Sequence, residues 1–123
     1  MAELVLIVDD DERNTKLARD VLERSGMRTL SAATAREAIA LAHEHLPDVV
    51  LMDLRLPDLD GDEAARRLAA DERTARIPVV ALTAQRFDDA EAWARRSGFA
   101  GYLSKPIDVA AFPGQVRGHC RRG

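Results

Sequence analysis

LVLIVDDD, residues 4–11, is a run of five apolar residues that ends in three consecutive aspartates. VVLMD, residues 49–53, repeats the pattern with a single aspartate. Two later runs, PVVALT at 78–83 and GYLSKP at 101–106, end in a threonine and in a lysine–proline pair. Short, continuously apolar runs are typical of strands buried on both faces of a parallel sheet. Each predicted strand therefore leads into a polar side chain.

The segments between these runs are amphipathic and predict helices. We expect one more strand at 28–32 and helices over 13–24, 35–45, 61–70 and 88–96, the first with an apolar stripe formed by Leu17, Ala18, Val21 and Leu22. Strands that alternate with helices imply parallel strands joined by right-handed crossovers. The predicted fold class is therefore α/β.

Local signals set the ends of these helices. Gly26 is placed to end the first helix in a left-handed conformation. Thr34 and Glu37 match a capping box at the start of the second helix, and Asp60 and Glu63 repeat that spacing at the start of the third.

The last predicted helix has conflicting signals. Asp108 is a suitable N-cap, which would place Pro113 about five residues inside the helix. An interior proline costs a helix about 3 kcal/mol, so we expect a kinked, short or frayed element. We expect residues 117–123 to form a frayed tail.

Composition limits the number of domains, the expected partners and the expected cellular compartment. A chain of 123 residues is long enough for one domain, and its net charge of −3 argues against nucleic acid or an anionic membrane as a partner. The single cysteine, Cys120, excludes an internal disulfide and fits a reducing cytoplasm. The first apolar run is too short for a signal peptide or a membrane span. We expect a cytoplasmic domain.

Five side chains are expected to converge at one edge of the sheet. In an open α/β sheet, the polar site forms outside the carboxyl ends of the strands. That edge would bring together three carboxylates, a hydroxyl and an amine, from Asp9, Asp10, Asp53, Thr83 and Lys105. Such a set can hold a divalent cation and receive a phosphoryl group on a carboxylate.

Magnesium is the expected cation. Mg²⁺ takes octahedral oxygen ligands and retains several waters, so one or two carboxylates suffice. Asp10 and Asp53 are the expected ligands, together with the backbone carbonyl of Arg55, while Asp9 would hold a metal-bound water or lie in the second shell. Mn²⁺ is expected to substitute for Mg²⁺.

The motifs VDDDERN, MDLRLPDLDG, ALTA and GYLSKPID together resemble the receiver domain of bacterial response regulators. Thr83 lies 30 residues and Lys105 lies 52 residues after Asp53, as in that family. The resemblance covers essentially the whole chain and is greatest to stand-alone DivK-type and CheY-type members. It implies a flavodoxin-like sheet of five parallel strands in order 2-1-3-4-5 with five helices, and a single receiver domain over 1–123 without an output domain.

The resemblance also implies residue roles. Asp53 would be the phospho-acceptor, and Asp9 and Asp10 the acidic pair, with Asp10 as the direct metal ligand. Thr83 and Lys105 would bind the phosphoryl group, and Tyr102 would be the aromatic switch residue. Pro106 would follow Lys105 through a cis peptide bond.

Several residues extend or complicate this assignment. Asp11 adds a third acid, which leaves open which pair serves the metal. Arg55 and Gln85 flank the site and are expected to tune the lifetime of the phosphate. Trp93, Phe87 and Tyr102 would border a partner surface, with Trp93 partly exposed; the alternative is that Trp93 is mostly core. The proline and glycines of the last helix disturb a face used for dimerisation, so we expect a monomer.

The implied function is a signalling switch in a two-component phosphorelay rather than a classical enzyme. A histidine kinase or phosphotransfer protein would donate the phosphoryl group to Asp53, protein contacts would change, and autodephosphorylation would reset the switch. DivK-like relatives imply cell-cycle-type control. The alternative is a protein-binding module of the same fold that works without phosphorylation. A haloacid-dehalogenase-type phosphatase would need an aspartate where Arg55 stands, and a nucleotide-binding module would need a glycine-rich loop in place of DDDERN.

Overall fold

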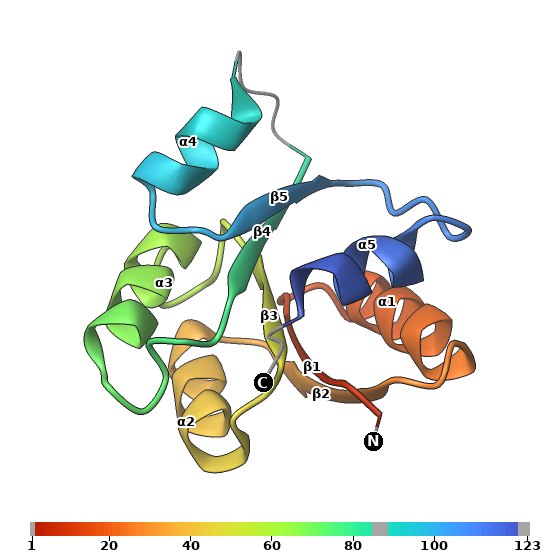
Figure 1. The fold of residues 1–123 in the computed structure, drawn as a ribbon, viewed down its shortest axis with the longest axis horizontal. Helices are drawn as coiled ribbons and strands as arrows, with labels where there is room; N and C mark the ends of the chain where they lie inside the picture. Colours follow the sequence, from red (N-terminus) through yellow and green to blue (C-terminus); the bar gives the residue numbers. More distant parts are fainter. Residues whose placement is uncertain (1, 85–88, 121–123) are drawn as a thin grey trace.

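The computed structural model describes residues 2–84 and 89–120, and its centre is a five-stranded parallel sheet in the order β2-β1-β3-β4-β5 (Figure 1). The strands are β1 (Leu4–Val8), β2 (Arg28–Ala32), β3 (Val49–Asp53), β4 (Val79–Thr83) and β5 (Gly101–Ser104). The predicted fold class and strand order are therefore confirmed. β4 begins one residue after the predicted run, at Val79, and ends at Thr83.

Helices cover both faces of the sheet (Figure 1). They are α1 (Glu12–Arg24), α2 (Ala35–His45), α3 (Gly61–Ala70), α4 (Ala90–Arg96) and α5 (Phe112–His119). α1 and α5 lie on one face, and α2, α3 and α4 lie on the other. None of the helices within the described ranges is long and apolar enough to cross a membrane.

Alternate residues of the central strands face opposite helical layers. Val5 and Ile7 pack with α1 and α5, whereas Leu6 and Val8 pack with α2, α3 and α4. All four side chains are at most 1% exposed. This two-sided burial explains why the strands are apolar at every position instead of alternating.

The ends of α1 and α2 follow the predicted signals. Gly26 has a φ of +88°, which is the left-handed conformation expected just past α1. The Thr34 hydroxyl accepts the Glu37 N–H at 3.1 Å, and the Glu37 carboxylate accepts the Ala33 N–H at 3.0 Å. Leu46, before Pro47, ends α2 with a φ of 48°.

Three expectations for the first four helices are wrong. Leu17 is 42% exposed and does not belong to the buried stripe of α1, which consists of Ala18, Val21 and Leu22. Asp60 is the N-cap of α3 but makes no side-chain capping bond, and the Glu63 carboxylate binds Arg66 and Arg67. α4 begins at Ala90 with Asp89 as its cap, and the predicted first residue, Asp88, lies outside the described residues.

The last helix differs from the prediction at both ends. α5 begins at Phe112, so Pro113 lies in its first turn, where proline has no N–H bond to lose. Asp108 caps a preceding turn and accepts the Ala110 N–H at 3.1 Å. Residues 117–119, expected in a frayed tail, are the last turn of α5, where the Arg117 guanidinium contacts Glu3 at 3.2 Å and the Ser25 carbonyl.

Candidate functional site

The register of the sheet brings the polar strand ends together. Val8 pairs with Met52, Asp53 with Leu82, and Thr83 with Ser104. The side chains that follow β1 and β5 therefore reach the edge where Asp53 and Thr83 end their own strands. All five predicted site residues, Asp9, Asp10, Asp53, Thr83 and Lys105, belong to this edge.

Three carboxylates form a group that fits a divalent cation. Asp9, Asp10 and Asp53 each offer an oxygen, and these atoms lie within 4.8 Å of one another. Asp9 is 3% exposed, Asp10 is exposed and Asp53 is half-buried. Carboxylate oxygens are the hard ligands that Mg²⁺ prefers, so the donor set fits that ion.

Both oxygens of Asp9 are already occupied within the protein. One accepts the Asp11 N–H at 2.9 Å and the other accepts the Lys105 ammonium at 2.9 Å. Its backbone N–H donates to the Ala32 carbonyl at 3.0 Å. This arrangement favours Asp10, which is exposed, over Asp9 as a direct ligand.

Asp11 has a local role in α1. Its carboxylate accepts the Arg13 N–H at 2.9 Å and caps the helix, which begins at Glu12. Among the described residues, the group of acids able to share an ion contains Asp9, Asp10 and Asp53 but not Asp11. The third aspartate of the opening motif is therefore a helix cap, and the first two belong to the group of acids that could hold an ion.

Lys105 neutralises part of this negative charge. Its ammonium lies 2.9 Å from Asp9 and 3.4 Å from Asp53. Burial alone would lower the pKa of Lys105, but the hydrogen bond and charge of Asp9, together with the charge of Asp53, raise its pKa above the usual value. The group therefore stays cationic and is available to an anion bound at Asp53.

The pKa of Asp53 is raised. The largest cause is burial, and the charge of Asp9 adds to it. The Arg55 N–H, which donates to the Asp53 carboxylate at 3.2 Å, and the Lys105 ammonium act in the opposite direction. Asp53 is thus an incompletely neutralised carboxylate that gains from a cation beside it.

The residues predicted to bind the phosphoryl group and to act as the switch lie on or just after the neighbouring strands β4 and β5. Thr83 is 4% exposed at the end of β4, and its carbonyl accepts the Lys105 N–H at 2.9 Å. The Lys105–Pro106 peptide bond is cis, which confirms the prediction. Tyr102 is half-buried on β5, opposite Ala81 of β4, and packs against the cluster of residues under α2, α3 and α4.

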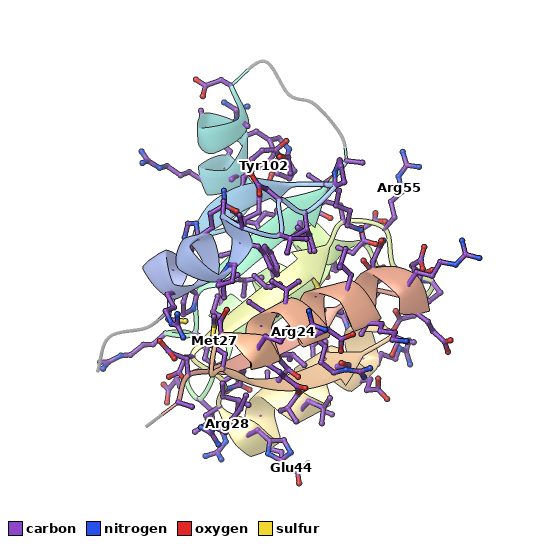
Figure 2. All side chains as sticks on the ribbon, turned by 90° about the vertical axis from the view of Figure 1, so that its right-hand side faces the viewer. Arg24, Met27, Arg28, Glu44, Arg55 and Tyr102 are labelled. Atoms are coloured by element: carbon purple, nitrogen blue, oxygen red, sulfur yellow. The ribbon has the colours of Figure 1, made fainter. Side chains whose placement is uncertain are left out.

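Of the residues predicted to flank the site or to form the partner surface, the structure describes Arg55 and Trp93 in addition to Tyr102. Figure 2 shows the Arg55 side chain extending from the loop after β3 into solvent, and Arg55 is exposed. Gln85 and Phe87 lie outside the described residues. Trp93 is half-buried and stacks on Phe99 with a ring separation of 5.7 Å, so it is neither fully exposed nor fully core.

Asp58 is a residue whose placement the sequence did not predict. Its carboxylate accepts the Ala35 N–H at 2.8 Å and the Arg36 N–H at 3.0 Å. These bonds, of which the first is the strongest cause, hold the pKa of Asp58 below its usual value. An acid of the loop after β3 therefore caps α2 across 23 residues of sequence, and no local pattern signals such a contact.

Comparisons with known proteins agree with this geometry. The family model for the response regulator receiver domain matches residues 5–117. The polar-differentiation response regulator DivK of Brucella ovis is 44% identical over 112 residues, which are 91% of each chain. The receiver domain of sensor histidine kinase PA1611 from Pseudomonas aeruginosa, solved with a magnesium ion coordinated in its active-site cleft, is 30% identical with a TM-score of 0.86, and the match covers 97% of this chain and 98% of that one. The chemotaxis response regulator CheY4 of Vibrio cholerae, 24% identical, has the same fold with a TM-score of 0.87 over 95% of this chain and 98% of that one.

Proposed function

The chain belongs to the response regulator receiver domain family, and on this premise we propose that Asp53 accepts a phosphoryl group with Mg²⁺ as cofactor. The observation that carries the proposal is the position of the Asp53 carboxylate, whose oxygen lies within 4.8 Å of oxygens of Asp9 and Asp10 and 3.4 Å from the Lys105 ammonium. A nucleophilic carboxylate and an anionic phosphoryl donor repel each other unless cations lie between them.

Asp10, Asp53 and the Arg55 carbonyl would hold the magnesium ion, and Asp9 would orient a metal-bound water. When bound, the ion neutralises charge on the carboxylates and on phosphoryl oxygens. Lys105, whose ammonium lies 3.4 Å from the Asp53 carboxylate, supplies the second positive charge.

The donor is a phosphohistidine of a histidine kinase or a phosphotransfer protein. An oxygen of Asp53 attacks phosphorus as the bond from phosphorus to the imidazole nitrogen breaks, and the imidazole keeps that electron pair. Attack of water on the same phosphorus later releases inorganic phosphate and restores the Asp53 carboxylate. Arg55 and Gln85 are proposed to affect the rate of this reset from beside the site.

The output is a population shift between two conformations. The Thr83 hydroxyl would donate to the phosphoryl group and Tyr102 would turn inward, which changes the surface formed by α4, β5 and α5. The phosphate can shift this equilibrium only by its different contacts in the two states. Trp93, with Tyr102 and Phe87, is proposed to lie on the surface that a protein partner reads.

The relative from Brucella ovis is named for polar differentiation. We propose for this chain a role in the same kind of process, through contacts between proteins in the cytoplasm and as a monomer.

Intact mass measurement after incubation with acetyl phosphate and Mg²⁺ tests the proposal. The wild-type protein should gain one phosphoryl group, and the adduct should be absent with EDTA in place of Mg²⁺ and absent in Asp53→Asn. Asp62→Asn is the matched control, because it removes one carboxylate of α3 that pairs only with Arg66 at the surface. No adduct on wild-type protein, while acetyl phosphate remains in solution, would favour a binding module that works without phosphorylation.

A further inference from the structure

We propose that Asp58 is a positioning residue for the metal site. It ties the loop of residues 54–60, which carries the Arg55 carbonyl, to the start of α2 and so maintains the affinity for Mg²⁺. The inference rests on the proposed function, because it concerns the same cation site.

The contact itself is specific. The two oxygens of the Asp58 carboxylate accept from consecutive backbone N–H groups, Ala35 at 2.8 Å and Arg36 at 3.0 Å. These are the first two residues of α2, whose N–H groups have no partner within the helix. Thr34 accepts the N–H of Glu37, so Asp58 and Thr34 cap different amides.

α2 is a fixed support for the loop. Ala35, Ala38 and Ala42 are completely buried against the sheet. The start of α2 follows β2, which pairs with the central strand β1. A carboxylate bonded to the first turn of this helix is therefore held relative to the sheet, and the chain on either side of it is held as well.

Backbone hydrogen bonds hold the remainder of the loop near its two ends, and Leu56 and Leu59 pack against the core under α2, α3 and α4. The Arg55 N–H donates to the Asp53 carboxylate at 3.2 Å, and the Gly61 N–H donates to the Leu54 carbonyl at 2.9 Å. Arg55 also forms an isolated antiparallel bridge with Asp60. Asp58 supplies the polar attachment in the middle, three residues after Arg55. Without it, the orientation of the Arg55 carbonyl would depend on the ends of the loop and on the non-directional packing of Leu56 and Leu59.

A competing explanation is that Asp58 stabilises α2 and has no effect on the site. The two explanations differ in what happens at residues 54–60 and at the cation. A simple cap predicts a change at the start of α2 only. A positioning residue predicts a change at both segments and a weaker site for Mg²⁺.

The experiment uses unphosphorylated protein, so it does not depend on phosphorylation. Mg²⁺ is titrated by calorimetry, and hydrogen exchange is measured at Ala35, Arg36 and residues 54–60. We expect Asp58→Ala to weaken Mg²⁺ binding roughly three- to tenfold and to speed exchange at both segments. Asp58→Asn keeps one acceptor oxygen and should have a smaller effect, and it replaces the alanine variant if thermal unfolding shows that the latter does not fold.

Two matched controls separate charge from position. Asp62→Asn removes the same charge from a nearby acid that has no bond to α2, and Arg36→Ala removes the surface partner 3.8 Å from Asp58 but keeps the backbone donor. Both should bind Mg²⁺ as the wild type does. Faster exchange at Ala35 and Arg36 with unchanged Mg²⁺ affinity in Asp58→Ala would overturn the inference. Magnesium binding by wild-type protein without a phosphoryl adduct would contradict the proposed function and leave the role of Asp58 intact.

Discussion

Lys105 lies closer to Asp9 than to Asp53, with 2.9 Å between its ammonium nitrogen and the Asp9 carboxylate and 3.4 Å to that of Asp53. Asp9 is buried, and its other oxygen accepts a backbone N–H. The resting ammonium is therefore shared between two carboxylates. A phosphoryl group on Asp53 must compete with Asp9 for this cation, and part of its binding energy replaces an existing ion pair.

Removal of this ammonium should destabilise the protein. Lys105→Met leaves Asp9 without a cation at a buried position, and we expect a loss of about 1–3 kcal/mol in the free energy of unfolding at pH 7. The pKa of Lys105 is raised above 10.5, so the stability that it provides is present below that pH and is lost as the pH rises through the folded-state pKa. Urea unfolding at pH 7 and at pH 11 should show the difference between wild type and variant shrinking at the higher pH.

Lys16→Met is the control, because Lys16 and Lys105 are the chain's two lysines and Lys16 is exposed on α1. Its effect should stay within about 0.5 kcal/mol. Equal losses in the two variants would show that the contacts of Lys105 with Asp9 and Asp53 contribute nothing.

Asp53→Asn should stabilise the protein in the absence of a cation. The pKa of Asp53 is raised above 3.8, mainly by burial, so its ionised form costs stability above the folded-state pKa. The variant should melt roughly 2–4 °C higher than wild type at pH 7 in EDTA. As the pH falls towards 3.8, the difference should disappear, because the wild-type carboxyl takes up its proton.

The same melting temperatures should also be measured with Mg²⁺ in place of EDTA. Mg²⁺ should raise the melting temperature of the wild type and have little effect on Asp53→Asn, because a ligand that binds the native state stabilises it. A variant that melts at or below the wild type at pH 7 in EDTA would contradict the assigned cost of the Asp53 charge.

Gly61→Ala should destabilise the start of α3. A Cβ built at Gly61 lies 2.9 Å from the Leu54 Cα and closer still to the Asp53 carbonyl oxygen, both of which are backbone. The substitution must move the loop after Asp53, and we expect it to lower the free energy of unfolding by about 1–3 kcal/mol. Chemical denaturation gives this value, and Mg²⁺ titration reports the movement of the loop.

Gly114→Ala should have the opposite effect on stability to Gly61→Ala. Gly114 lies in α5, and a Cβ there meets nothing within 4 Å. Alanine should stabilise α5 by about 0.5–1 kcal/mol, because glycine in a helix is less favourable. If both variants lost similar stability, crowding at Gly61 would not be the cause.

Cys120 should react slowly with alkylating reagents. Burial, supported by the charges of Asp48 and Glu3, raises its pKa from 9.0 to about 11. The thiolate is the reactive form, so alkylation by iodoacetamide at pH 8 should be about 100-fold slower than for a thiol of pKa 9.0 and should increase about tenfold per pH unit. Protein unfolded in urea is the control; equal rates in the folded and unfolded forms would contradict the raised pKa.

The sequence predicted the sheet and the site because both depend on patterns that are local. Each strand is a short apolar run, and each site residue directly follows such a run or ends it, so chain order and the parallel sheet suffice to bring Asp9, Asp53, Thr83 and Lys105 together. The capping pair of Thr34 and Glu37 is likewise local, and its hydrogen bonds are present.

The errors arose where a local pattern allows more than one structure or where a long-range contact replaces it. Glu63 has the spacing of a capping residue but binds Arg66 and Arg67, which lie on the same side of α3. Pro113 fits the first turn of α5, so the helix begins at Phe112 and not after Asp108. Asp58 precedes α3 in the sequence, but its bonds go to α2. A single sequence holds no signal for that long-range contact.

The order in which the site residues occur along the chain has a consequence for biosynthesis. β1 and β3 pair directly, and both lie within the first 53 residues, so Asp9, Asp10 and Asp53 can meet as soon as that part of the chain leaves the ribosome. The ammonium that pairs with Asp9 comes 96 residues after it. A nascent chain that has been translated only as far as β3 therefore carries the three carboxylates without the lysine that pairs with Asp9. The charge balance of the site is complete only once β5 and Lys105 have been translated.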